Sequence, residues 1–510
     1  MPIQPTYPGV YIQEVASGVR TITGVATSIA AFFGRALKGP VNVAVRCTSY
    51  SDFLRGFGAV AHPKSDLKNS VKQFFDNGGG DCYVVRLAVG AAKATGPLLN
   101  GVGAGANLLR VKAKSEGLWG NNIRVDIVMD ATSGLFGFTV SEVQGTVIIS
   151  SEPTYVNLSM DPASPRYVVD VVTQSSSLID VEVITAPTTF TAADGPKTVA
   201  AAPLTGGVDE TGPLTLTQFT GNPSVHTGFY ALDKVDLFNL MIIPGDFNIT
   251  EAIYKTIIDP ASLYCEKKRA FFLADAPQSW TLGEQMNADA TKANTFRTGM
   301  SKQYSAVFFP RIKYSDVGFT KTIGPSGAIA GLMARTDSQR GVWKAAAGTE
   351  ADLRLINDVE LNMTDNENGT LNKLGVNCIR KFPNGIVNWG ARTLDGSDDF
   401  GSEWKYIPIR RLALFLEESL FRGTKWVVFE PNDEPLWAKI RMNLNAFMLS
   451  LFRQGAFQGS TPDKAFFVKC DGETTTANDR NLGIVNIQVG FAPLKPAEFV
   501  IITIQQIPDV

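Results

Sequence analysis

Both ends of the chain carry hydrophobic patterns that are typical of β-strands. The segments are 7–15 and 498–506, and residues 499–504 are β-branched or aromatic throughout. A half-buried strand would alternate between polar and apolar residues, so the second segment indicates burial on both faces. Chain ends usually fray unless other structure holds them. We therefore expect each end to join a sheet, in this chain or a neighbour, through Val10, Tyr11, Ile12, Val15, Phe499, Val500, Ile501, Ile502 and Ile504.

Residues 21–90 combine strand-like and helix-like patterns. Val41–Cys47 alternates like a strand, and Cys82–Leu87 is a second, more apolar strand. Between them an apolar stripe with helical spacing follows Ser65, which can cap the first turn of that helix. Because a helix lies between the two strands, we expect them to be parallel.

Residues 216–385 return to the same mixture after an intervening segment of different composition. Val235–Ile243, Ala270–Ala274 and Ala306–Phe309 are short apolar runs, each typical of a buried strand, with helical patterns between them. A mostly parallel sheet covered by helices is the natural packing for such an alternation.

The last quarter of the chain has the most regular pattern. We expect a helix over Arg410–Arg422, a strand over Lys425–Phe429, and a helix of about 20 residues that begins near Pro435. The apolar stripe of that last helix comprises Trp437, Ile440, Leu444, Phe447, Met448 and Leu451. Further strands are expected at Ala465–Lys469, Ile484–Val489 and Glu498–Gln506.

Residues 91–215 differ from their surroundings in composition. Gly, Ala, Ser and Thr dominate, short alternating strands such as Ile123–Val128 recur, and acidic residues outnumber basic ones over 131–200. We interpret this segment as an inserted all-β domain with an acidic outer surface. The fold class that results is a mixed α/β (α+β), multidomain protein with an α/β core and extended β-arms at both ends.

Composition excludes several classes of protein. The 510 residues are 44% hydrophobic and 19% charged, with a formal net charge of −2, which fits a folded protein of two to four domains. There is no overall charge bias toward nucleic acid, and no apolar run approaches the roughly 18 residues that a membrane span needs. The first basic residue is Arg20, so a secretory signal is not expected.

The sequence offers little chemistry. The five scattered cysteines are typical of buried free thiols in a reducing compartment, and the two histidines, His62 and His226, have no second ligand at metal spacing and are expected on the surface or in loops. No phosphate-binding loop and no Gly-x-Ser-x-Gly elbow is present. We therefore expect no catalytic residues, no metal and no cofactor.

Several motifs together resemble those of contractile tail sheath proteins. They lie at 7–11, 24–36, 52–58, 334–344, 388–394, 410–419, 429–433 and 490–493. The likeness covers residues 7–90 and about 325–510, whereas 91–215 is not matched in detail. Sheaths of this family surround phage tails, R-type pyocins and extracellular contractile injection systems.

The resemblance implies a structural, non-enzymatic subunit. Its copies would form six-fold rings stacked helically around an inner tube, and contraction would drive the tube through a target envelope. Baseplate and tail-terminator or cap proteins would be further partners, without nucleic acid or membrane insertion. Assembly would occur in the bacterial cytoplasm, before any extracellular release of the particle.

Five parts follow from the pattern and the resemblance together. Residues 1–20 would be an N-terminal linking arm and 491–510 a C-terminal one. Residues 21–90 with 216–385 would form the core, 91–215 an outer inserted domain, and 386–490 an inner C-terminal domain. In the helix that begins near Pro435, Lys439, Arg441 and Arg453 are the charged residues that would face acidic groups on the tube.

Two alternatives remain at this point. One is an α/β enzyme with a hydrolase-like sheet, which would need a pocket with convergent polar groups. The other is a different tail component, such as a tube or baseplate protein. Whether the particle is a phage tail or an injection system, which host and target it has, and whether a second sheath isoform is present are left open by one sequence.

Overall fold

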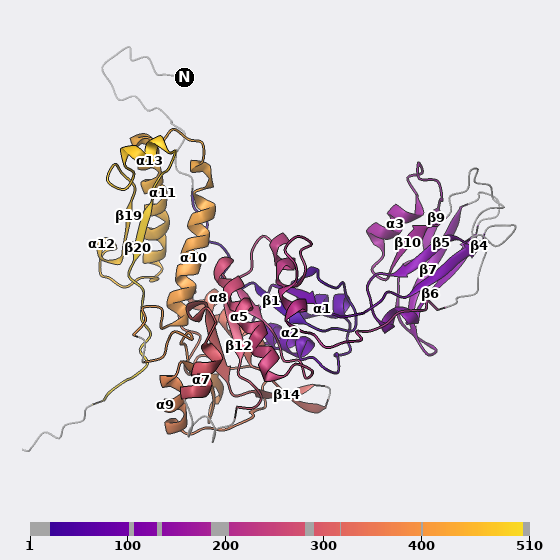
Figure 1. Cartoon of the computed structure of the whole chain (residues 1–510), viewed down its shortest axis with the longest axis horizontal. Coiled ribbons are helices and arrows are strands. Elements are labelled where there is room, and N and C mark those ends of the chain that lie inside the picture. Colours follow the sequence, from indigo (N-terminus) through magenta and orange to yellow (C-terminus); the bar gives the residue numbers. More distant parts are fainter. Residues whose placement is uncertain are drawn as a thin grey trace, which may run out of the picture. The chain divides into compact units, whose positions relative to one another are not determined.

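The computed structural model describes residues 21–100, 107–129, 135–184, 203–280, 290–316, 318–398 and 401–502. The chain forms two compact units (Figure 1). Unit 1 comprises Met1–Thr27, Thr336–Ala345 and Tyr406–Val510, and unit 2 comprises Ser28–Arg335 and Ala346–Lys405. The five-part division expected from the sequence stays a prediction.

An eight-stranded sheet forms the centre of unit 2. Its inner strands pair in parallel, and the antiparallel strands β18 and β2 close the two edges. Inner strands such as β1, β12 and β13 are buried at every position, as their nearly continuous apolar sequences require. In sheet order the strands are β18 (Gly385–Asn388), β17 (Val376–Phe382), β13 (Ser305–Phe309), β12 (Phe271–Asp275), β11 (Leu240–Ile242), β1 (Ala30–Gly34), β3 (Cys82–Arg86) and β2 (Ala44–Cys47).

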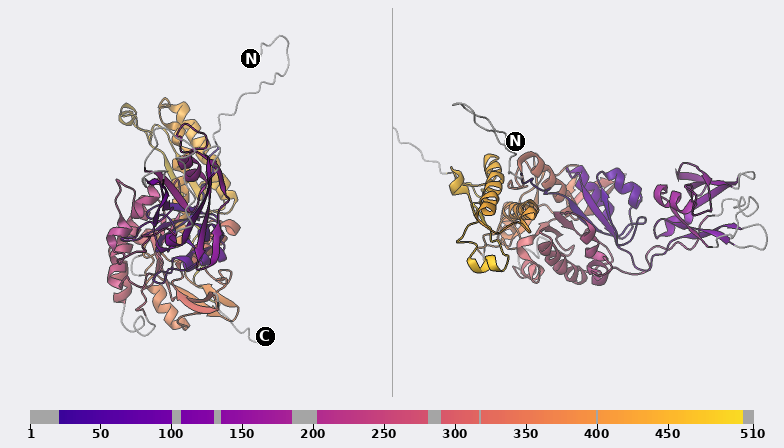
Figure 2. Two further views of the ribbon diagram at one scale, coloured as in Figure 1. Left: turned by 90° about the vertical axis from the view of Figure 1, so that its right-hand side faces the viewer. Right: turned by 90° about the horizontal axis from the view of Figure 1, so that it is seen from above.

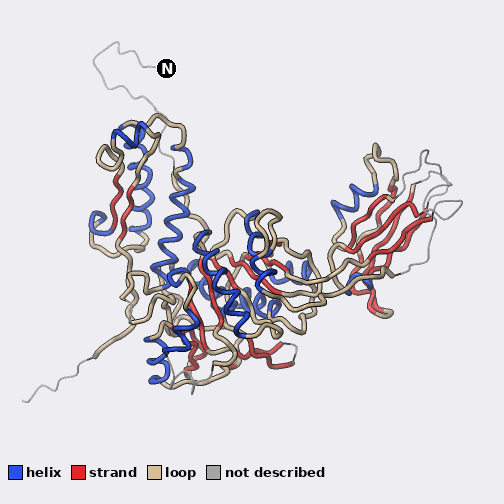
Figure 3. The backbone as a smooth tube through the Cα atoms, viewed as in Figure 1, coloured by secondary structure: helices blue, strands red, loops and turns tan. Residues whose placement is uncertain are grey.

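Helices alternate with these strands along the chain, as Figure 3 shows by colour. The ring of Phe74 in α2 meets Phe32 of β1 edge-on at 5.6 Å. Helix α8 packs so closely on α2 that a Cβ atom at Gly331 would lie 2.2 Å from the Phe74 carbonyl oxygen. The helical elements of the core are α1 (Tyr50–Phe57), α2 (Leu67–Asp76), α4 (Leu216–Thr220), η2 (Gly228–Lys234), α5 (Glu251–Lys267), α7 (Ala290–Arg297), η3 (Lys302–Tyr304), α8 (Ser326–Arg340) and α9 (Asp365–Lys373).

The connections of the sheet reverse direction between β1 and β11. From β1 the chain proceeds through β2 to β3 on one side, and after the insertion it continues from β11 through β12 and β13 to β17 on the other. Between β13 and β17 the chain also forms a small sheet of three strands. In sheet order these are β15 (Phe319–Ile323), β14 (Ile312–Asp316) and β16 (Asp358–Val359). In open α/β sheets such a reversal leaves a crevice at the carboxyl ends of the strands.

The expected parallel pairing of the first two strands is wrong. β2 pairs with β3 antiparallel, and the parallel partner of β3 is β1. Two helices, α1 and α2, lie between β2 and β3, so the chain can re-enter the sheet beside β2 in the opposite direction. Ser65 also precedes the capping position: its Oγ accepts a hydrogen bond from the Leu67 N–H, whereas the residue at the cap is Asp66.

The inserted segment contains two antiparallel sheets with their own apolar core. The prediction that this segment consists largely of β-strands is therefore confirmed. It is not purely β, because helix α3 (Val168–Ser175) and η1 (Leu118–Asn122) belong to it. Its strands lie together in both further views (Figure 2). One sheet contains β10 (Ile179–Val183), β5 (Asn107–Ala113) and β4 (Thr95–Asn100), and the other β6 (Ile123–Met129), β7 (Phe136–Gln144), β8 (Val147–Ser151) and β9 (Tyr155–Leu158).

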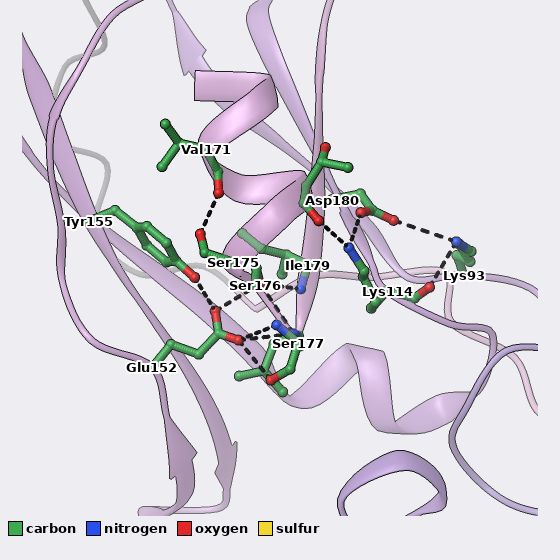
Figure 4. A network of polar contacts seen from close by, with 12 residues as sticks. Lys93, Lys114, Glu152, Tyr155, Val171, Ser175, Ser176, Ser177, Ile179 and Asp180 are labelled. Carbon is green, nitrogen blue, oxygen red and sulfur yellow. Dashed lines mark hydrogen bonds and ion pairs between the residues drawn. The ribbon is translucent and has the colours of Figure 1, made fainter. Parts of the chain in front are cut away.

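Glu152 holds the second of these sheets to the end of α3 (Figure 4). One carboxylate oxygen accepts hydrogen bonds from the Tyr155 hydroxyl at 3.0 Å and the Ser176 hydroxyl at 2.8 Å. The other accepts from the backbone and side chain of Ser177 at 2.6 and 2.9 Å. A partly buried carboxylate with this many donors fixes the geometry between two elements that do not share a sheet.

Unit 1 is built on two long helices and a small sheet. Helix α11 (Glu434–Arg453) packs with α10 (Ile407–Gly423) and the antiparallel strands β19 (Phe466–Lys469) and β20 (Gln488–Phe491) around one apolar cluster. All six residues of the predicted α11 stripe are buried, and Asp433 caps the helix. The remaining elements are η4 (Lys425–Val427), α12 (Pro462–Ala465) and α13 (Ala477–Asn481).

Two predicted strands of this unit are wrong or displaced, and the third, Glu498–Gln506, stays a prediction because its partner was expected in this chain or in a neighbour. Lys425–Phe429 forms η4 and a turn, and Phe429 has a backbone φ of +69°, which a strand cannot have. The strand expected at Ile484–Val489 begins four residues later, as β20. Residues 498–502 of the last expected strand have no strand partner in the described chain.

Candidate assembly surfaces

The segment that leads back toward the N-terminus lies along α10. Ile22 is 6% exposed, and a Cβ atom at Gly423 would approach its side chain to 2.7 Å. The Val25 N–H donates to the Ser419 hydroxyl at 3.1 Å. Residues 22–27 therefore run antiparallel to the helix and are fixed before the chain continues toward residue 20.

A buried ion pair secures the inner end of this segment. Arg411 donates to both carboxylate oxygens of Asp337, at 3.0 and 2.5 Å, and to the Thr27 carbonyl at 2.9 Å. The Thr27 hydroxyl donates to the same carboxylate at 2.6 Å. The side chains of Arg411 and Asp337 are each only 5% exposed, so both desolvated charges depend on this bidentate geometry. We call Thr27, Asp337 and Arg411 the arm-root clamp.

Sequence reasoning did not identify the clamp. Its three residues belong to three of the motifs singled out above, but they are far apart in the sequence. The one hint in the sequence was that each of these motifs contains a polar or charged residue that could form such a contact. Nothing in one sequence states that the three positions meet.

The C-terminal segment is held at one point and then exposed. The Tyr406 hydroxyl, at the start of α10, donates to the Glu498 carboxylate at 3.1 Å. Beyond it the side chains of Phe499, Val500 and Ile501 are 74%, 80% and 91% exposed. Ile502 is 79% exposed, whereas Ile504, like Val10, Tyr11, Ile12 and Val15, lies outside the described residues. Four consecutive large apolar residues in water are unfavourable unless another surface covers them.

Strands β19 and β20 form a sheet of only two strands. The Ala492 N–H donates to the Ala465 carbonyl, so the register turns the backbone groups of Val468, Val489 and Phe491 toward the outer edges. No strand in the described part of the chain pairs with either outer edge. Such edges are templates for further strands, and two strands alone are marginally stable.

The exposed side of α11 carries fewer free charges than expected. Lys439 and Arg453 are exposed and form no ion pair with any described residue. Arg441, in contrast, forms an ion pair with Glu434 at 2.5 Å and donates to the Cys470 carbonyl. The predicted set of three basic residues is therefore not equally available, because Arg441 is bound within its own unit.

Among the reactive side chains, Cys47 of β2 and Cys82 of β3 lie directly opposite each other in their antiparallel pair. All five cysteines are buried free thiols, as predicted. His62 lies in a loop, which is one of the two expected places, but its side chain is 8% exposed and contacts Glu210 at 2.9 Å. Arg35 also forms an ion pair with Glu210. Over the described ranges, no group of three potential ligands could hold a metal ion. Nor does any described helix combine the length and the apolar character of a membrane span.

Comparison with known families gives two adjacent matches. Residues 220–394 match the family described as phage tail sheath protein central domain, and residues 399–507 match the phage tail sheath C-terminal domain. Together they cover more than half of the chain. A curated relative, the tail sheath protein of Vibrio phage KVP40, is 24% identical over 280 residues, which is 53% of this chain but 38% of the phage protein.

Solved structures with the same fold cover nearly the whole chain. The sheath of the extracellular contractile injection system PVC, in the contracted state, is 22% identical with a TM-score of 0.58, and 99% of each chain is covered. The contracted helical sheath of the anti-feeding prophage is also 22% identical, with a TM-score of 0.58 over 98% of this chain and 99% of that one. The sheath tail protein of Listeria innocua is 12% identical, with a TM-score of 0.61 over 92% and 96%.

Proposed function

This chain belongs to the phage tail sheath family, and on that premise we propose that it is a structural subunit of a contractile sheath. Copies polymerise helically, in stacked six-fold rings, around an inner tube. Contraction of the polymer drives the tube through a target envelope. A baseplate and a tail-terminator or cap protein bind the two ends of the sheath. The particle assembles in the bacterial cytoplasm and acts as a phage tail or as a released injection system.

The observation that carries the proposal is the combination of anchored arms with open sheet edges in unit 1. Residues 22–27 and Glu498 are fixed to α10, and the side chains of Phe499 to Ile502 that follow Glu498 are exposed. The same unit presents β19 and β20 with unpaired outer edges. Strands from adjacent copies would supply the missing main-chain hydrogen bonds, and alternate side chains would set their register. When each copy binds the next through two different surfaces and the ring does not close, the result is a helix of subunits.

Deletion of residues 1–18 tests this linkage. The truncated chain keeps the arm-root clamp, so it should fold, but it should no longer form tubes under negative-stain electron microscopy. A matched control replaces the exposed apolar Val147 and Ile148 of β8 with Asp, which alters surface polarity without touching an arm. Tubes formed by the truncated chain at normal yield would refute the linkage.

The tube-facing role of α11 is a separate part of the proposal. Lys439 and Arg453 are exposed on one helix and are available to acidic groups of a tube, whereas Arg441 is already paired. Opposite charges between two partners chiefly set their encounter and register. The segment 91–215 would lie outermost, where added residues disturb polymer contacts least.

Charge reversal distinguishes this helix from the rest of the surface. Lys439→Glu together with Arg453→Glu should reduce co-sedimentation of the sheath with its tube protein by at least about tenfold. Lys464→Glu, the same kind of charge reversal at one exposed position of α12, should leave co-sedimentation unchanged, and each single α11 reversal is compared with it. Equal binding by both variants would remove α11 from the tube interface.

A further inference from the structure

A pocket of about 290 Å³ opens at the carboxyl ends of β11 and β12. The segments that follow these strands, 243–247 and 275–279, form its walls, together with Asp66, Arg311 and Gly324. It lies beside the reversal of strand order between β1 and β11, where α/β sheets commonly bind ligands. All of its lining residues belong to unit 2 and to the described part of the chain.

Acidic side chains dominate the lining. Asp66, Asp246, Glu251 and Asp275 line the pocket, and Arg311 is the one basic residue among its lining residues. Two of the acids have close partners, because Arg35 binds Asp246 and the Ser279 hydroxyl donates to Glu251. Asp275 accepts hydrogen bonds from the Ser326 N–H and hydroxyl, both at 2.8 Å.

Asp66 differs, because the Asn69 side chain donates a hydrogen bond to its carboxylate but one oxygen has no donor in the described part of the chain. The residue is 4% exposed, and its Oδ2 atom has no hydrogen-bond donor among the described residues. The nearest cation, the Arg311 guanidinium, is 3.8 Å away and donates instead to the Thr322 carbonyl at 2.9 Å. A buried carboxylate oxygen without a donor costs free energy that a ligand could recover.

Glycines keep the space beside both central carboxylates open. A Cβ atom at Gly245 would lie 2.9 Å from Asp66 Oδ2, and one at Gly324 would lie 2.1 Å from Asp275 Oδ2. Both glycines line the pocket. The lining includes no histidine or cysteine, so its chemistry favours binding of a cation over nucleophilic catalysis.

We propose that this pocket binds a compact organic cation, an alkylammonium or guanidinium group, whose N–H donors reach Asp66 Oδ2. The group could be part of a free amine or the end of a Lys or Arg side chain from a second copy. The proposal goes beyond the role as a sheath subunit and does not depend on it, since an isolated chain already contains the complete pocket.

Protonation of Asp66 makes the binding pH-dependent. Burial raises the pKa of Asp66 to about 7, Asp275 acts in the same direction, and Arg311 and Lys321 oppose it. A cation binds the deprotonated carboxylate and competes with the proton. From that pKa, affinity at about pH 5.5 should be roughly thirtyfold lower than at about pH 8, and binding near pH 7 should release a proton.

Calorimetric titration of the full chain with propylammonium and with methylguanidinium tests the proposal. Saturable binding at about pH 8 that weakens at about pH 5.5 is expected for at least one probe. Asp66→Asn should abolish it, and Gly245→Ala should weaken it by narrowing the space at Oδ2. Asp170→Asn, at an exposed position of α3, is the control. Absence of saturable binding by both probes, or binding retained in Asp66→Asn, overturns the proposal.

Assembly assays distinguish the two sources of the cation. If a second copy supplies the group, Asp66→Asn reduces polymer yield and the free probes compete with assembly. If a free amine is the ligand, assembly is unchanged while the titrations still show binding. The outcome is independent of the arm deletion, because that variant leaves the pocket intact and must bind the probes equally well.

Discussion

Asp337 accepts hydrogen bonds from two chain segments that are distant in sequence. Its substitution should therefore disturb unit 1 strongly, because both segments lose a partner. Arg411 and Thr27 together satisfy its carboxylate, and the guanidinium is almost fully desolvated. An ion pair of this kind adds little net stability compared with apolar packing, but removal of one partner is costly. Its role is therefore to specify where residues 22–27 lie.

Asp337→Ala should destabilise unit 1 by about 3 kcal/mol, because it leaves the Arg411 charge buried without a partner. Urea unfolding followed by tryptophan fluorescence measures the change, and limited proteolysis should show cleavage at residues 21–27. The control in the same unit is Glu473→Ala, which removes the largely exposed partner of Lys469 and should cost less than about 1 kcal/mol. Equal losses for the two variants would contradict the assigned role of the clamp.

At the level of elements, local sequence determined helices better than strands. The bounds of α11 follow from Asp433, Pro435 and an unbroken apolar stripe, all of which are local. The run at Lys425–Phe429 has the composition of a strand, but it is too short to show the alternation of polar and apolar residues that distinguishes a strand. In the structure it forms a short helix followed by a turn at Phe429. The direction of β2 and the meeting of the clamp residues depend on contacts across the fold, so the sequence alone could not supply them.

The small sheet of unit 1 allows an element-level prediction. Phe467 of β19 lies over Gly490 of β20, where a Cβ atom would come within 2.1 Å of the ring. Gly490→Ala should push the half-exposed ring outward and lower stability by about 1 kcal/mol. Gly472→Ala, at a position with open space around it, should be neutral. Hydrogen exchange at residues 466–469 reports the difference, and unchanged protection in Gly490→Ala would show that the ring adapts without cost.

At the scale of the whole molecule, the inserted segment enters and leaves through two extended segments that are joined by a β-bridge. Ala92 and Val208 exchange both backbone hydrogen bonds, at 3.0 and 3.1 Å. Opposite residues of such a pair lie about 5.5 Å apart, so a short linker can join them. The eight-stranded sheet takes no strand from the insertion.

Replacement of residues 93–207 by a short glycine linker should therefore leave a folded chain that still forms tubes of the same symmetry but smaller outer diameter. Circular dichroism and electron microscopy measure the two properties. A folded variant that no longer polymerises would show that the insertion contributes subunit contacts. Variants cut inside β7, which break its sheet, should aggregate and serve as the comparison.

The two described terminal segments contact opposite ends of the same helix. Residue 22 meets α10 at Gly423, and Glu498 meets it at Tyr406, so the attachments are separated by a rod of 17 residues, about 25 Å long. If one neighbour pulls on the N-terminal arm and another on the C-terminal arm, the tension runs along α10 and bypasses the β-sheets of unit 2. A helix under tension along its axis keeps its length, so α10 would hold the two attachment points at a constant distance while the subunits of the polymer rotate.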